Sequence, residues 1–344
     1  MNAVRQKIVD AIMEKAKKEC PGAVDLVGIY GSVCTGDVHE HSDLDLLILI
    51  NDPKGYVLSK VFILDDEEIG YDVYCTSWEN LEDDANCGHA HLSKLMDSQV
   101  LYVREESVTE RLEGLKNQVR EILGSDKRFE AIEGIREELC KIYGRAFVAE
   151  TVGQLRGWAA YMITLSLDAV MLWNGTYFKR GVKRTFEELE GLDVPDGFEM
   201  IVMKIVKAKN FIELGIALGT LFKTVMRFTE RRTRKDAPTQ ERLAGTYEEM
   251  FSNWRNKMPE AAERGDAFAS FMNLASLQYM FEEIRSENAI PRFSVLEEFD
   301  AGDLAKNAKI FDDAIEEYRQ EYVKLGMEPE RFASVDEFVK AYLK

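Results

Sequence analysis

The sequence predicts an α+β protein of two domains, with a mixed sheet first and an all-helical bundle after it. Three observations predict this class. Apolar runs of strand length occur up to about residue 104, helical periodicity alone continues after it, and 344 residues exceed what one hydrophobic core usually organises. We expect the domains to cover residues 1–115 and 116–344.

The first domain is predicted to mix helices and strands. Residues 1–19 repeat apolar side chains at about four-residue steps, which is typical of a helix, and Pro21 and Gly22 end it. Asp72 interrupts an alternating apolar strand that we expect to pair beside the strand of Asp45. The expected strands are 24–31, 42–50 and 99–104, with one or two more within 56–78.

The second domain is predicted to be helical throughout. Ser334 and Glu337 have the spacing of a capping box and open the last helix. Helical periodicity covers residues 108–124, 128–173, 198–232, 266–287 and 303–326, and helix joints are expected at Asn174-Gly175, Pro195, Pro238, Pro259 and Pro291.

Composition excludes several classes of protein. The formal net charge of −18 repels a nucleic-acid backbone, so no nucleic-acid partner is expected, and the same field favours a cationic small substrate. The five cysteines form no C-x-x-C pair, which favours reduced thiols in the cytoplasm. The longest apolar stretch, residues 158–173, is interrupted by Asp168 and is too short to span a membrane.

Two aspartates at the start of a very apolar strand are the first candidate site. Asp43 and Asp45 are two residues apart, so on a strand their side chains point to the same face. Two such carboxylates stay ionised in an apolar setting only with a cation, and Mg²⁺ is the natural one. For an isolated pair, a turn cap at Asp43 and an exposed strand end at Asp45 would be a sufficient explanation.

Gly31 and Ser32 end the preceding apolar strand. Their presence favours a metal and phosphate site over a turn cap and an exposed strand end. Glycine lets a backbone approach a phosphate closely, and the serine hydroxyl is a donor. A Gly-Ser pair alone indicates only a tight turn. The combination of this pair with the two aspartates, after ten intervening residues, and with Asp72 is more specific.

At these residues the chain resembles the DNA polymerase beta-type nucleotidyltransferase superfamily. The matching residues are Tyr30-Gly31-Ser32, then Ser42-Asp43-Leu44-Asp45-Leu46, then Asp72, and they cover about the first hundred residues. The resemblance implies transfer of a nucleoside monophosphate (NMP) from a nucleoside triphosphate (NTP) to a hydroxyl, with release of pyrophosphate. ATP is the first candidate for the NTP. The resemblance implies that Gly31 and Ser32 hold the triphosphate. It also implies that Asp43 and Asp45 hold two Mg²⁺ ions, and that Asp72 holds the catalytic one or helps to deprotonate the hydroxyl.

The helical second half is similar to the small-molecule branch, of which kanamycin nucleotidyltransferase is an example. This resemblance implies a small hydroxyl-bearing acceptor such as an aminoglycoside, with antibiotic resistance as a consequence. It also implies a general base early in the helical domain, for which Glu150 is the candidate, with Glu137 and Glu138 behind it. For any one of these glutamates, a solvated carboxylate on a helix face is the simpler explanation and is favoured.

Residues 174–184 are strongly basic. Lys179 and Lys183, with Arg180 and Arg184, would bring positive charge to the triphosphate, although a basic surface turn is an equal alternative. The histidine pairs His39/His41 and His89/His91 have a spacing that can hold a transition metal on a strand. Both pairs fall in expected loops, so we favour polar loops, with His41 near the nucleotide.

Two other functions stay open. One is NMP transfer to a protein or RNA, as in regulatory or toxin-type members of the superfamily. The other is nucleotide binding without catalysis.

Overall fold

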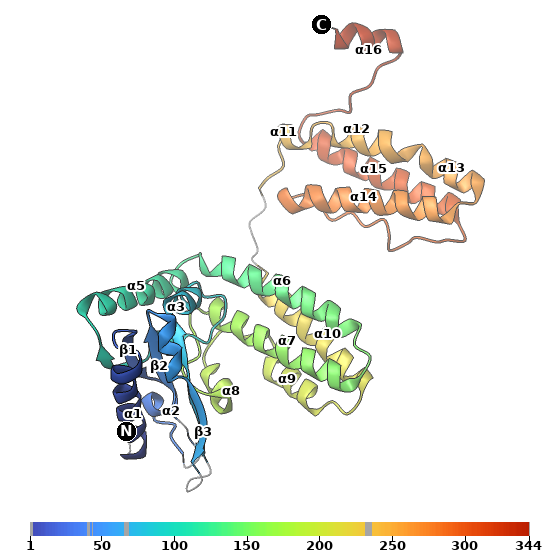
Figure 1. Cartoon of the computed structure of the whole chain (residues 1–344). Helices are drawn as coiled ribbons and strands as arrows, with labels where there is room; N and C mark the ends of the chain where they lie inside the picture. Colours follow the sequence, from blue (N-terminus) through green and yellow to red (C-terminus); the bar gives the residue numbers. More distant parts are fainter. Residues whose placement is uncertain (1–2, 40–41, 43, 65–68, 231–235, 344) are drawn as a thin grey trace. The chain divides into compact units, whose positions relative to one another are not determined.

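The computed structural model describes residues 3–39, 42, 44–64, 69–230 and 236–343. It divides into two compact units, Met1–Arg231 and Arg232–Lys344, which are described separately. The fold is α+β, as predicted: a small mixed sheet lies near the N-terminus and helices make up most of the remainder (Figure 1).

The first unit contains every strand among the described residues. Its strands are β1 Val24–Ile29, β2 Leu46–Ile50, β3 Lys60–Leu64, β4 Ile69–Val73, β5 Cys75–Ser77 and β6 Gln99–Val103. Its α-helices are α1 Ala3–Glu19, α2 Ser32–Thr35, α3 Trp78–Ala85, α4 Ser93–Met96, α5 Glu106–Leu123, α6 Arg128–Phe147, α7 Val152–Trp173, α8 Thr185–Glu188, α9 Phe198–Lys207 and α10 Phe211–Phe228. Two 3₁₀ turns are η1 Pro53–Leu58 and η2 Val182–Arg184.

The main sheet has four strands in the order β5-β2-β1-β6. β1 is antiparallel to both β2 and β6, whereas β5 runs parallel to β2. β3 and β4 form a separate antiparallel pair, in which Asp72 lies opposite Val61. The strand of Asp72 therefore pairs with β3 among the described residues, and only its continuation, β5, pairs beside β2.

β2 is buried on both faces because two hydrophobic cores meet at the sheet. Leu47 and Leu49 belong to a core shared with α3 and with α5, α6, α7, α9 and α10. Ile48 and Ile50 belong to the other core, which contains the apolar face of α1. The period of two along a strand sends alternate side chains into opposite layers. This explains why the run of apolar residues is unbroken.

The helices that follow the sheet pack on one another in the first unit. α6, α7 and α10 are in mutual contact, and α9 contacts α10 (Figure 1). The predicted helical stretch 128–173 is two helices, because Thr151 caps α7 by accepting a hydrogen bond from the Gln154 N–H. The stretch 198–232 is likewise divided, by the cap Asn210 at the start of α10.

The second unit is entirely helical among its described residues. Its elements are α11 Gln240–Leu243, α12 Thr246–Met250, the π-helical turn η3 Phe251–Arg255, α13 Lys257–Arg264, α14 Ala267–Glu287, α15 Leu304–Lys324 and α16 Val335–Tyr342. Its core contains only residues between Leu243 and Tyr322. Ser334 and Glu337 cap α16 as predicted, since the Glu337 N–H donates to Ser334 Oγ and the Ala333 N–H to Glu337 Oε2.

All but one of the predicted helix joints lie between helices in the structure. Pro259 does not separate helices but lies in the first turn of α13, where its missing N–H has no intrahelical partner to lose. The predicted domain boundary, residue 115, falls inside α5, and the first core contains residues on both sides of it. No helix among the described residues combines the length and hydrophobicity needed to cross a bilayer. All five cysteines are free thiols.

Candidate functional site

The turn after β1 requires a glycine. Gly31 has φ 67° and ψ −144°, in a region that side chains with a Cβ rarely adopt. A Cβ on Gly31 would also lie 2.7 Å from the Cγ atom of Asp45, and closer still to its Oδ2 atom. The carboxylate of Asp45 thus lies directly on the backbone of this turn.

Asp45 is held there by the sheet. It immediately precedes β2, and its carbonyl accepts a hydrogen bond of 3.1 Å from the Tyr30 N–H. Asp45 is half-buried, so at the start of β2 it is held in place and still accessible to solvent. Asp43, the other predicted metal ligand of this strand, lies outside the described residues.

A cavity of about 430 Å³ opens over this turn. One wall comes from the sheet region and contains Tyr30, Gly31, Ser32, His39, Ser42 and Asp45. The other wall is the basic segment 179–183, which follows α7. The structure therefore brings the predicted phosphate-binding residues Gly31 and Ser32 together with Lys179 and Lys183. Polar residues that the sequence did not indicate, Asp37 and Ser93, also line it.

The basic segment is fixed at its start by backbone hydrogen bonds. The Phe178 N–H donates to the Ala90 carbonyl at 2.8 Å. The N–H groups of Lys179 and Arg180 both donate to the Glu188 carboxylate, at 2.8 and 2.9 Å. These contacts leave the Lys179 and Lys183 side chains exposed at the cavity wall.

Asp37 connects the two walls. Its carboxylate accepts hydrogen bonds from Arg180 Nε at 2.7 Å and from Arg180 Nη2 at 2.5 Å. The hydrogen bond from Arg180 holds the pKa of Asp37 well below its usual range, and a further bond from the Thr35 hydroxyl acts in the same direction. Asp37 is therefore ionised at neutral pH.

Asp72 is not among the residues that line the cavity. It lies on β4 with its side chain exposed. In the parallel pair of β2 and β5, Ile48 lies opposite Cys75, so Asp45 and Asp72 each precede a paired residue by three positions. The pairing of β2 and β5 ends before it reaches the two acids, and Asp72 lies in the separate β3–β4 pair, so the two acids share no site among the described residues.

Glu150 is placed away from the cavity. It is exposed and lies just before the first turn of α7, whereas the basic segment follows the last turn of that helix. α7 has 22 residues, and at 1.5 Å per residue its length is about 33 Å. The structure therefore does not bring Glu150 to the nucleotide residues.

The acidic residues of the cavity are suited to a divalent cation only in part. Mg²⁺ typically takes one or two carboxylates together with substrate phosphates, and Asp45 offers one at the cavity. The Asp37 carboxylate is occupied by Arg180. The described residues contain no cluster of three or more acidic, histidine or cysteine side chains that could hold a metal ion. A complete ligand set would thus need Asp43.

The histidine pairs have different settings. His39 lines the cavity, and His41, which was expected near the nucleotide, lies outside the described residues. His89 is 3.3 Å from Asp84, and this contact raises the pKa of His89 above its usual value. His91 stacks on Phe178, with 5.4 Å between the ring centroids, and lies 3.7 Å from the buried Asp168. His89 thus joins the loop before α4 to α3, and His91 joins it to α7; within the part of the chain that the structure describes, neither belongs to a metal cluster.

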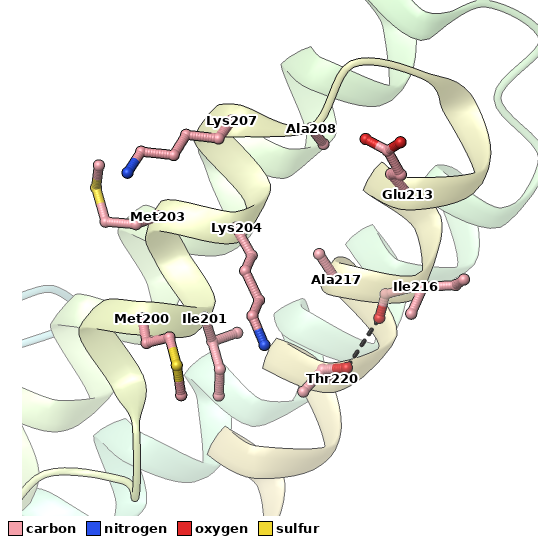
Figure 2. A pocket seen from close by; sticks show the side chains of 10 residues that line it. All are labelled: Met200, Ile201, Met203, Lys204, Lys207, Ala208, Glu213, Ile216, Ala217 and Thr220. Atoms are coloured by element: carbon pink, nitrogen blue, oxygen red, sulfur yellow. Dashed lines mark hydrogen bonds between the residues drawn. The ribbon is translucent and has the colours of Figure 1, made fainter.

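A second cavity, of about 510 Å³, lies between α9 and α10. Figure 2 shows Lys204 and Lys207 on one helix and Glu213 on the other, around a lining of methionine and isoleucine side chains. It contains none of the predicted site residues.

The turn, the acid and the basic segment define a pocket suited to a polyphosphate at the edge of a mixed sheet. Residues 6–138 match the model of the nucleotidyltransferase domain family, over less than half of the chain. This match supports the superfamily predicted from the sequence; the aminoglycoside branch stays a prediction.

No curated protein matches the chain. One similar solved structure is described as a nucleotidyltransferase-like protein from Exiguobacterium sibiricum 255-15. It is 11% identical, the similarity covers 80% of this chain and 91% of that chain, and the TM-score is 0.35. A likeness of this size has no bearing on the chemistry.

Proposed function

We propose that the protein transfers the NMP group of an NTP, with ATP as the first candidate, to a hydroxyl of a small acceptor and releases pyrophosphate. One observation carries this proposal: Gly31, Ser32 and Asp45 line the same cavity as Lys179 and Lys183. The family match of residues 6–138 supports the same reaction class.

The residues have separate roles in this proposal. The backbone at Gly31 and the hydroxyl of Ser32 bind the triphosphate. Lys179 and Lys183 supply positive charge that the chain as a whole, with its net charge of −18, lacks. Nucleotidyl transfer depends mainly on positioning and on neutralising phosphate charge, and these residues serve both needs.

Asp45 and Asp43 would hold Mg²⁺, and we expect two ions. Asp72 stays the candidate third ligand, since β4, on which it lies, is followed by β5, the parallel neighbour of β2. When bound, the metal neutralises phosphate charge and orients the triphosphate. Glu150 has no role in the proposal, because a helix about 33 Å long separates it from the basic segment.

The acceptor in this proposal is a small cationic molecule such as an amino sugar. The net charge of −18 attracts cations and disfavours RNA. If the acceptor is an aminoglycoside, modification of the drug and resistance to it follow.

The test is a pyrophosphate-release screen of the four NTPs with Mg²⁺ against amino sugars and other hydroxyl compounds. With a responsive acceptor, Asp45→Asn should reduce release at least about a hundredfold, because charge stabilisation is lost where the transition state needs it. Asp52→Asn is the matched control. Asp52 follows β2 at its opposite end and caps η1, a role that asparagine can also fill.

Other results would redirect or reject the proposal. Unchanged release in Asp45→Asn would reject the metal assignment. Label from the NTP on a protein or RNA, with none on any small molecule, would indicate a macromolecular acceptor. Tight NTP binding with no turnover across the acceptor panel would indicate a protein that binds nucleotide without catalysis.

A further inference from the structure

An ion pair joins the two walls of the nucleotide cavity. Asp37 follows the short helix α2, and Arg180 follows α7, 143 residues later in the chain. Both residues line the cavity. Two parallel N–H···O bonds make the pair bidentate, the arginine–carboxylate geometry that fixes orientation as well as distance.

The surrounding charges reinforce this pair. Arg184 Nε lies 3.4 Å from Asp37 Oδ1, and Lys183 Nζ donates to the Asp37 carbonyl at 3.3 Å. Glu187 contacts Arg180 at 3.3 Å and Arg184 at 2.5 Å. Every cation of the segment except Lys179 thus contacts Asp37 directly, and Lys179 precedes Arg180 immediately.

The Asp37 side chain is only 7% exposed and that of Arg180 is 31% exposed, so the carboxylate is shielded from water and the guanidinium is partly so. Exposed ion pairs contribute little because solvent screens them, whereas a shielded bidentate pair with several partners holds its geometry. The segment is also anchored by the Glu188 carboxylate and by the Phe178–Ala90 hydrogen bond, but these contacts act on the backbone of its first residues.

We propose that Asp37 is a positioning residue, which through its pair with Arg180 holds segment 179–184 over the cavity and so sets the affinity for the triphosphate. This inference rests on the proposed function. Asp37 does not need to touch the nucleotide. Its effect is to keep Lys179 and Lys183 on the wall opposite Gly31 and Ser32, so that the charged pocket exists before the nucleotide binds.

The expected effect follows from preorganisation. If the segment is held in place only a tenth of the time without Asp37, the apparent Kd for nucleotide rises about tenfold. The intrinsic chemistry is unchanged, so KM should rise by a similar factor and kcat should change by less than about threefold.

The experiment titrates the full-length protein with each NTP, with and without Mg²⁺, by calorimetry. The variants are Asp37→Asn, Arg180→Gln and the double variant. The two single changes should each weaken binding about tenfold, and the double variant should be no weaker than the worse single variant, since both remove one interaction. Asp37→Glu, which keeps the charge, should restore part of the affinity.

Asp312→Asn is the matched control. Asp312 accepts two hydrogen bonds from Arg255, at 3.0 and 3.4 Å, so it loses the same kind of pair at a place that does not line the cavity. Its nucleotide affinity should equal that of the wild type. Thermal unfolding of all variants separates lost affinity from lost structure.

The outcomes distinguish this inference from the proposed function. If the wild type binds no nucleotide, the proposed function fails. If the wild type binds and Asp37→Asn binds equally well, the proposed function stands and the positioning role is rejected. Tighter binding by Asp37→Asn would also reject it, because Asp37 would then compete with phosphate for Arg180.

Discussion

Gly31 lets the Asp45 side chain approach the backbone of the turn after β1 closely. Two separate features require a glycine at position 31: the positive φ angle, and the lack of space for a Cβ beside Asp45. Gly36, five residues later, has only the first of them: its φ is 76°, and an added Cβ would have open space around it to 4 Å.

This contrast predicts different effects for the same substitution. Gly36→Ala should lower the free energy of unfolding by about 1 kcal/mol, the usual cost of a left-handed non-glycine residue. Gly31→Ala should cost more, about 2–3 kcal/mol, because Asp45 must also move. It should weaken nucleotide binding as well, whereas Gly36→Ala should not. Chemical denaturation and calorimetry measure both quantities, and equal effects of the two substitutions would contradict the role of the Asp45 contact.

At the residue scale, a site residue can be predicted from the sequence when the residues that reveal its role lie close to it in the chain. Gly31, Ser32 and Asp45 could be predicted because an apolar strand ends at one motif and another begins at the next. Lys179 and Lys183 could be predicted from local basic composition. Asp37 could not, because its partner lies 143 residues away and no local spacing indicates the pair.

The strand β2 is the element on which both cores of the first unit depend. Leu47 and Ile48 are adjacent and both fully buried, but they belong to different cores. Their side chains lie on opposite faces of one sheet.

Truncating each side chain should therefore loosen a different layer. Leu47→Ala and Ile48→Ala should each cost about 2–5 kcal/mol, the usual range for a buried large-to-alanine change. Ile48→Ala should speed amide hydrogen exchange in α1, and Leu47→Ala should speed it in the helices of the other core, such as α5. Hydrogen exchange resolved by element tests this. Equal acceleration in α1 and α5 by both variants would show that the layers open together.

At the element scale, helix type could be predicted better than helix ends. Periodicity identified 128–173 as helical, but the break at residues 148–151 depends on the Thr151 cap and on how α6 and α7 pack together. This break, with the length of α7, is also why Glu150 could not be placed from sequence. The sequence predicts the strand of Asp72, but alternation alone does not specify its partner, which is the preceding strand β3 and not the strand of Asp45.

The whole molecule consists of two units with separate cores. The buried residues of the first two cores lie between Val9 and Val225, and those of the third lie between Leu243 and Tyr322. All described residues that line the cavity over Gly31 belong to the first unit.

The fragment 1–230 should therefore fold alone and bind nucleotide with the Kd of the full chain. It retains both cores and the whole cavity, and a chain of this length buries a sufficient core. Circular dichroism melting and calorimetry with the fragment test this. A fragment that melts without a cooperative transition, or that binds at least tenfold more weakly, would contradict the independence of the first unit.

The two-sided burial of β2 has a consequence for synthesis on the ribosome. The four strands of the sheet are complete when residue 103 has emerged, but the core on one face includes residues up to Val225. At about 5–20 residues per second, the roughly 120 residues in between take about 6–24 s to make. During that interval the part of this core that α5 to α10 supply is missing, so the nascent chain presents apolar side chains that the finished core buries, the kind of surface that chaperones bind.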